Sequence, residues 1–229
     1  MRTLAWAGAT LFVCALLFFA WSYAGPFGDP TAGSERARPL AIDVALFGIF
    51  ALHHSLLART GTKALVTRIV PAPLERTTYI WMASLLFIAV CAWWQPVPGV
   101  LWSTAGATTW ALRALSLVGV WLTLHSAAML DMFELAGTRG FMRPNAGATG
   151  ELTAHGPYGL VRHPIYLAWL FLVWTPTTMN GTRLAFAAIS TAYLVIGIPF
   201  EERSLHASIG PAYAAYASRV RWRLVPGIY

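Results

Sequence analysis

Long apolar segments follow one another along most of this 229-residue chain and constrain its fold more than any other feature. A helix needs about 20 mostly apolar residues to cross the hydrocarbon core of a bilayer. The pattern predicts an all-α fold: a polytopic membrane helix bundle of about six transmembrane helices, ending in a helical hairpin and an amphipathic tail. The predicted spans are 4–24, 40–57, 78–94, 108–130, 164–179 and 184–200, and the tail runs from Glu201 to Tyr229.

The composition agrees with a protein that is surrounded by lipid. Only 11% of the residues are charged, whereas soluble domains carry about 25%. The net charge of +7 is better explained by an anionic bilayer surface than by nucleic acid. We expect one integral membrane domain over residues 1–229, with an uncleaved first span. Cys14 and Cys91 lie in apolar runs and are interpreted as core residues without a disulfide.

The basic residues predict an orientation. If the N-terminus is cytoplasmic and six spans alternate, twelve of the sixteen Lys and Arg residues fall on the cytoplasmic side. Cytoplasmic loops are the ones enriched in Lys and Arg. Both termini and the polar segment between residues 131 and 162 are therefore expected in the cytoplasm. The four basic residues on the other side are Arg36, Arg38, Arg113 and Arg183.

The densest polar cluster lies where this segment enters the fifth predicted span. Its glycines and prolines allow sharp turns and a close approach to a ligand. Pro164 suits the first turn of a helix, and a helix N-terminus attracts anions. A site for a carboxylate or phosphate is one interpretation; a capped helix whose Arg and His reach lipid headgroups is the other. The candidate binding residues are His155, Gly156, Tyr158, Leu160, Arg162, His163 and Tyr166.

Two adjacent acids, Glu201 and Glu202, follow the last predicted span. Carboxylates at a membrane boundary are costly unless they are solvated or paired. One of them is expected to face a cation inside the bundle while the other pairs with Arg162 or Arg203. The alternative is a solvated helix end.

Histidines near the ends of the second and fourth spans form a third set. His53, His54 and His125 lack the H-x-x-x-H or E-x-x-H spacing of helical metal sites, so we expect no metal. A lone histidine inside a membrane is usually an interhelical hydrogen-bonding group. The sequence contains no Walker loop, dinucleotide fingerprint or nucleophile elbow.

Two motifs in the last third of the chain resemble signatures of a known family. Gly156-Pro157-Tyr158 with Arg162-His163-Pro164 and Tyr166 is similar to the G-x-Y-x-x-x-R-H-P-x-Y signature of isoprenylcysteine carboxyl methyltransferases and their bacterial relatives. Their E-E-x-x-L and G-x-x-Y-x-x-Y signatures resemble Glu201 to Leu205 and Gly210 to Tyr216.

The front half resembles the bacterial methanethiol S-methyltransferase branch, which overlaps with NnrU-like proteins. The similar segments are His54 to Arg59, Glu75 to Tyr79 and Phe133 to Arg139. Leu130-Asp131 stands where an Asn-His pair is expected, and Ala136 stands in place of Phe.

The resemblance implies a membrane methyltransferase that uses S-adenosylmethionine. It implies that the donor's carboxylate binds Arg162 or His163, its sulfonium lies near Glu201 or Tyr158, and its adenine near Leu160 and Trp169. It further implies that residues 131–229 bind this cofactor and that residues 1–130 form a four-span acceptor side. Candidate bases for a thiol acceptor are Glu202, His54 and His125.

The implied reaction is methylation of a small thiol such as methanethiol to a thioether such as dimethyl sulfide. Three alternatives stay open: an isoprenylcysteine-like carboxylate as acceptor, a phospholipid amine as acceptor, and a non-catalytic NnrU-like membrane protein. Partners are then the acceptor and membrane lipids, without nucleic acid. The expected location is the bacterial inner membrane.

Overall fold

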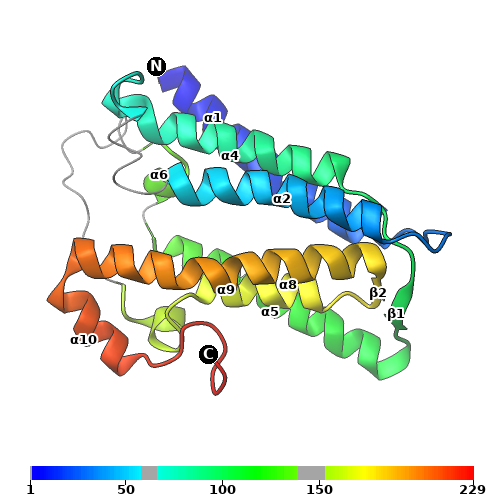
Figure 1. Ribbon diagram of the computed structural model, residues 1–229. Coiled ribbons are helices and arrows are strands. Elements are labelled where there is room, and N and C mark those ends of the chain that lie inside the picture. Colours follow the sequence, from blue (N-terminus) through cyan, green and yellow to red (C-terminus); the bar gives the residue numbers. More distant parts are fainter. Residues whose placement is uncertain (1, 58–65, 131, 139–152) are drawn as a thin grey trace. The chain divides into compact units, whose positions relative to one another are not determined.

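The computed structural model describes residues 2–57, 66–130, 132–138 and 153–229. The described residues hold five helices that are long and apolar enough to cross a membrane, which confirms the prediction of a polytopic helical membrane protein (Figure 1). Each helix starts and ends near the bounds of its predicted span, except that the last helix continues beyond its predicted C-terminal end. They are α1 (Arg2–Ala24), α2 (Ala37–Leu57), α4 (Ala72–Trp93), α5 (Gly106–Ala128) and α9 (Gly181–Ile209).

The fifth predicted span is only partly helical. Helix α8 covers Pro164–Trp174, and the chain then runs into strand β2 (Thr178–Asn180), which pairs with β1 (Val100–Ser103). The helix ends there because Pro176 lacks an N–H group and disfavours a helical residue before it. Gly181 follows directly, and a Cβ at this position would lie 2.6 Å from the Val97 carbonyl oxygen. Only glycine fits at position 181, because the backbone of Val97 and Pro98 lies too close for a side chain.

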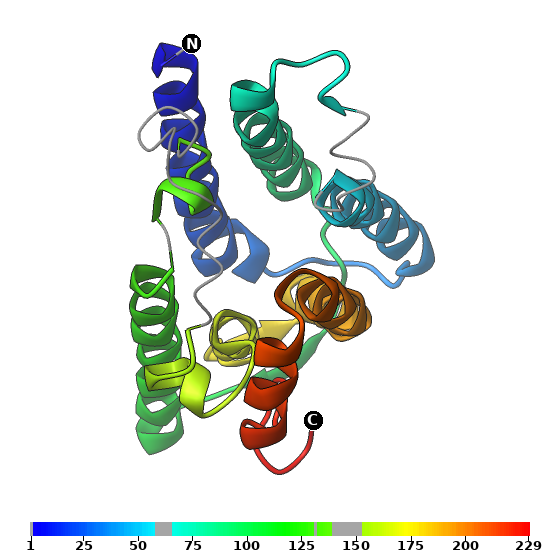
Figure 2. The same cartoon turned by 90° about the vertical axis from the view of Figure 1, so that its left-hand side faces the viewer.

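The last long helix extends beyond its predicted end at Phe200. Helix α9 continues through Glu201 and Glu202 to Ile209, so the two acids lie within a helix and not at its end. Gly210, with φ of +68°, ends it, and Pro211 starts α10 (Pro211–Arg219). Figure 2 shows α10 turning away from the axis of α9. The amphipathic tail is therefore a separate short helix followed by an irregular segment.

The chain divides into two compact units. The first contains α1, α2, α4, the short α6 (Met132–Leu135) and the beginning of α9. Helix α4 packs against both α1 and α2. The fully buried Phe186 of α9 lies at the centre of this core. The rings within about 6 Å of its ring belong to Phe19, Tyr23, Phe27, Phe47 and Trp94.

The first unit also contains a buried arginine. The side chain of Arg183 donates hydrogen bonds to the carbonyl oxygens of Tyr23 and Ala24, at 2.9 and 2.8 Å. These carbonyls end α1, where the helix dipole favours a cation. Asn180 adds hydrogen bonds to the carbonyls of Phe27 and Asp29. Buried polar groups at this end of α9 are therefore paired.

The second unit contains α5, the 3₁₀ turn η2 (Gly156–Gly159), α8, α9 from Ser190 onward, α10 and the C-terminal segment. Helices α5 and α8 pack closely: a Cβ on Gly119 would lie 2.9 Å from the Cβ of Phe171. Small residues allow such close helix contacts in membranes. Trp169 of α8 donates a hydrogen bond to Ser190 of α9, so α8 contacts both α5 and α9.

Candidate functional site

The segment before α8 is held by the C-terminal tail. The backbone N–H groups of Arg162 and His163 donate to the carbonyl oxygens of Trp222 and Arg223, both at 2.9 Å. Pro164 then starts α8, as its fixed φ and missing N–H favour. Two backbone hydrogen bonds between residues sixty positions apart therefore fix the direction in which the Arg162 and His163 side chains leave the backbone.

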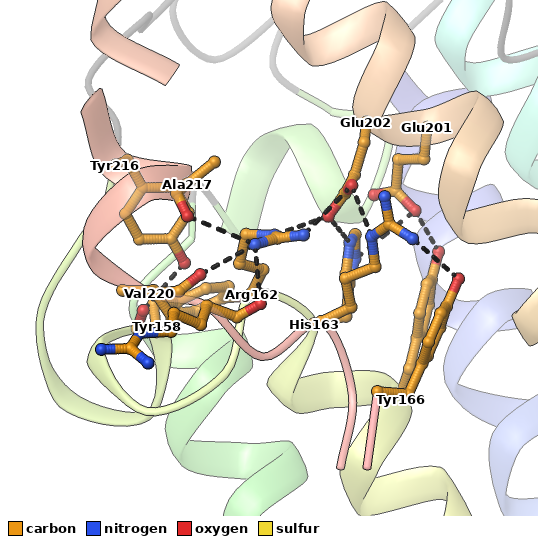
Figure 3. A network of polar contacts seen from close by, with 12 residues as sticks. Tyr158, Arg162, His163, Tyr166, Glu201, Glu202, Tyr216, Ala217 and Val220 are labelled. Atoms are coloured by element: carbon orange, nitrogen blue, oxygen red, sulfur yellow. Dashed lines mark hydrogen bonds and ion pairs between the residues drawn. The ribbon is translucent and has the colours of Figure 1, made fainter. Parts of the chain in front are cut away.

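Glu202 accepts hydrogen bonds from two arginines (Figure 3). The Nε of Arg162 lies 2.6 Å from its Oε1, and the Nε of Arg223 lies 2.9 Å from its Oε2. The ring nitrogen Nε2 of His163 lies 3.4 Å from Oε1. The side chains of Arg162 and Glu202 are only 9% and 8% exposed, so these charge-assisted bonds are largely shielded from water.

The remaining donors of Arg162 point to the end of α10. Its Nη1 donates to the carbonyl oxygens of Val220 and Arg221, at 2.8 and 3.0 Å, and more weakly to that of Ala217 at 3.4 Å. Its Nη2 donates to Oε2 of Glu202. The guanidinium therefore links α9, the end of α10 and the tail, and all three of its nitrogens are engaged.

Glu201, the neighbour of Glu202, lies in a different environment. Its side chain is 44% exposed, and Oε2 accepts a 2.7 Å hydrogen bond from the Tyr166 hydroxyl. The Tyr166 ring stacks on the His163 ring with centroids 5.3 Å apart. Of the two acids, Glu202 is the one that pairs with Arg162, whereas the Arg203 guanidinium lies over the Phe200 ring. Glu201 remains partly open for contact with a cation.

The glycine-rich turn η2 is anchored on α5 and α10. The Tyr216 hydroxyl donates to the Tyr158 carbonyl at 2.8 Å. Burial raises the pKa of Tyr216 to about 12, with opposing effects of Arg162 and Glu202, so the hydroxyl keeps its proton at neutral pH. Gly156 has φ of +59°. A Cβ there would lie 3.0 Å from the Met129 side chain and 3.8 Å from Nε2 of His125.

The structure thus brings most of the predicted residues of the last third together. His125, on the last turn of α5, stacks on Trp121 and lies beside Gly156. His155 and Leu160 border the turn but are exposed, Leu160 to 71%. Residues 139–152 of the predicted cytoplasmic segment lie outside the described residues.

His54 belongs to the first unit. Its Nδ1 lies 2.9 Å from the hydroxyl of Tyr79, over whose ring the Arg76 guanidinium is placed. Thr77 donates to the carbonyl of Gly137. The three front-half segments of the sequence analysis are therefore joined in one unit. In the described part of the chain, no group of three or more His, Cys, Asp or Glu side chains is arranged to hold a metal ion.

One residue of the buried cluster, Arg223, was missed by sequence reasoning. Its pKa is raised by Glu202 and Tyr229 against the opposite effect of burial. Its guanidinium lies 5.3 Å from the centre of the Tyr229 ring. The only signal in the sequence is a basic tail, in which Arg219, Arg221 and Arg223 are indistinguishable by pattern.

The apolar helices define a polytopic membrane protein. Its polar site is the ionic cluster in which Glu202 of α9 binds Arg162, just before α8, and Arg223 of the tail. Methanethiol S-methyltransferase 2 of Bradyrhizobium diazoefficiens is 31% identical over 231 residues, covering 98% of this chain and 88% of the relative. Methanethiol S-methyltransferase of Mycobacterium tuberculosis is 34% identical over 198 residues, covering 84% and 80%. The chain belongs to the methanethiol S-methyltransferase family, among the isoprenylcysteine carboxyl methyltransferase-like membrane proteins.

The similarity extends to animal proteins. Nurim of Sus scrofa is 31% identical over 205 residues, covering 78% of each chain. No family model matches the chain, and no solved structure is significantly similar to it. The protein is a methyltransferase. As such it uses a methyl donor and a small-molecule substrate, and its apolar helices contact lipid.

Proposed function

We propose that this protein transfers a methyl group from S-adenosylmethionine to a small thiol such as methanethiol, giving a thioether such as dimethyl sulfide. The observation that supports this most strongly is the similarity, over 84% or more of the chain, to relatives named methanethiol S-methyltransferase. The thiolate sulfur attacks the methyl carbon of the donor and forms a new S–C bond, while the bond between that carbon and the cationic sulfur breaks and S-adenosylhomocysteine leaves. The protein's own contribution is to position the two sulfurs and to accept the thiol proton.

The residues around Glu201 fit the cationic part of such a donor. A half-exposed carboxylate beside the stacked rings of Tyr166 and His163 suits a sulfonium or ammonium group. We propose that His155, Gly156, Tyr158 and Leu160 line the donor from the η2 side. Arg162 then acts mainly through the tail, because its nitrogens are already bonded to Glu202 and to backbone carbonyls.

The three candidate bases differ in the groups that contact their side chains. Glu202 would have to accept a proton while it faces two guanidinium groups, which disfavours protonation. We propose that Glu202 fixes the donor site and that a histidine accepts the thiol proton. His125 lies beside Gly156 in the same unit as Glu202, and His54 is held by Tyr79 in the first unit. We also propose that residues 131–229 bind the methyl donor and that residues 1–130 form the side that binds the acceptor.

We propose the bacterial inner membrane as the location, with both termini cytoplasmic. Twelve of the sixteen basic residues then face the cytoplasm. This orientation needs a crossing between Pro164 and Asn180. Helix α8 supplies about 16 Å of this crossing at 1.5 Å per residue. We propose that residues 175–180, which end in strand β2, complete it.

Headspace gas chromatography tests the reaction. Membranes containing the protein are given S-adenosylmethionine and methanethiol, and dimethyl sulfide is measured against membranes without the protein and against His163→Ala. Product is expected only with the wild type. Donor binding is measured separately by calorimetry in detergent. A protein that binds donor but makes no dimethyl sulfide would have a different acceptor, and a prenylcysteine or phosphatidylethanolamine substrate would then be tried. A protein that binds no donor would overturn the proposal.

A further inference from the structure

Tyr213 carries a buried hydroxyl without a hydrogen-bond partner among the described residues. The residue is 1% exposed and is the largest fully buried side chain within the described part of the chain. Buried polar groups in folded proteins are nearly always paired, so an exception requires an explanation. Such a hydroxyl can bind a buried water, can bind a ligand, or can stay unpaired at a cost in stability.

The ring of Tyr213 is fixed in place by its neighbours. Tyr216 and Val220 form a buried cluster with it, and the His206 ring meets its face edge-on with centroids 4.7 Å apart. Partly buried residues that complete the cluster are Ala154, Leu205, Ile209 and Ala217. A ring enclosed in this way cannot swing to find a partner, so its hydroxyl points to one place whether or not that place is occupied.

That place lies within the electrostatic influence of the ionic cluster. Burial raises the pKa of Tyr213 above its usual value, the charge of Glu202 raises it further, and Arg162 lowers it. The hydroxyl therefore stays protonated and can donate a hydrogen bond. Tyr216, one turn further along α10, already uses its hydroxyl on the Tyr158 carbonyl. Of these two buried tyrosines of α10, one hydroxyl is paired and the other has no partner among the described residues.

We propose that Tyr213 is a further binding residue of the donor site, whose hydroxyl donates a hydrogen bond to an oxygen of the bound methyl donor. The proposal rests on the proposed function, because it takes S-adenosylmethionine as the ligand. The donor offers two kinds of such oxygen, those of its carboxylate and those of its ribose hydroxyls. In either case the ligand accepts a hydrogen bond from the Tyr213 hydroxyl, which has no partner among the described residues.

The test compares Tyr213→Phe with Tyr216→Phe, the matched control. Removing an unpaired hydroxyl should leave the thermal midpoint of the donor-free protein unchanged or raise it, whereas removing the paired hydroxyl of Tyr216 should lower it. For S-adenosylhomocysteine, we expect Tyr213→Phe to raise the dissociation constant about 5- to 10-fold. If the loss disappears with decarboxylated S-adenosylmethionine, the carboxylate is the partner; if it persists, the ribose is.

Two results would overturn the inference. An unchanged dissociation constant in Tyr213→Phe would mean that the hydroxyl meets only a buried water. A lower thermal midpoint without donor would mean that the hydroxyl is paired within the protein. Failure of the wild type to bind any donor is a separate outcome, because it refutes the proposed function itself.

Discussion

The Nε of Arg162 lies 2.6 Å from a carboxylate oxygen of Glu202, across forty positions of sequence. This bond joins the start of α8 to the interior of α9, and the same carboxylate reaches the tail through Arg223. The R-H-P and E-E motifs are thus two halves of one ionic cluster. Four predictions follow from this cluster and from the front-half contacts.

Glu202→Gln should destabilise the protein strongly. The amide leaves the buried guanidinium of Arg162 without a counter-charge and removes that of the partly exposed Arg223. This costs about 3 kcal/mol or roughly 6 to 12 °C in the thermal midpoint. Glu201→Gln is the control, because that side chain is 44% exposed; it should shift the midpoint little but weaken donor binding. Equal midpoints for the two variants would contradict the difference in burial.

Arg223→Ala should loosen the tail. The carbonyls of Trp222 and Arg223 protect the amides of Arg162 and His163, and loss of the Glu202 contact should speed hydrogen exchange at these two amides. Because the Arg223 side chain is 37% exposed, its stability contribution is about 1 kcal/mol.

Arg221→Ala is the matched control for the tail. Its side chain is exposed, and its backbone carbonyl, which accepts from Arg162, is kept. Exchange measured by mass spectrometry on peptides covering residues 160–166 should be unchanged. If Arg223→Ala leaves the exchange as slow as Arg221→Ala does, the tail is held by its backbone alone.

Tyr79→Phe should affect the acceptor and not the donor. The Tyr79 hydroxyl lies 2.9 Å from Nδ1 of His54 and orients that ring. We expect kcat/KM for methanethiol to fall about fivefold with an unchanged donor dissociation constant.

His53→Phe is the control for Tyr79→Phe. The His53 ring stacks on Tyr79, and its nitrogens have no hydrogen-bond partner within the described ranges, so an apolar ring should be tolerated. If Tyr79→Phe weakened donor binding as well, the contact between Tyr79 and His54 would stabilise the fold in general and would not serve the acceptor specifically.

Gly137→Ala should disturb the joined front-half segments. Gly137 has φ of +70°, and a Cβ there would lie 2.9 Å from Cγ1 of Ile80 and 3.2 Å from the Arg76 carbonyl oxygen. The positive φ costs about 1–2 kcal/mol for any L-residue, and overpacking adds roughly 1–3 kcal/mol. Gly106, with φ of +60° and open space around it, carries the first cost alone. Thermal unfolding should therefore rank Gly137→Ala below Gly106→Ala.

The helices and the motifs could be predicted from the sequence because both are local properties. Twenty apolar residues in a row define a membrane helix wherever they pack, and the R-H-P and E-E motifs are read from adjacent positions. The prediction failed where a local cue was underweighted: Pro176 ends α8, and α9 does not stop at Phe200 but continues to Ile209.

Which of two adjacent acids is buried was decided only by the tertiary structure. Glu201 and Glu202 are neighbours in sequence, but consecutive residues of a helix point about 100° apart, so they cannot face the same surroundings. The choice depends on Arg162 and Arg223, which lie 40 and 21 positions away. The sequence by itself determined that a membrane protein carries these two acids directly after its last apolar span. Packing of the tail against the segment before α8 decided which one is buried, because ion pairs form between groups that folding brings together.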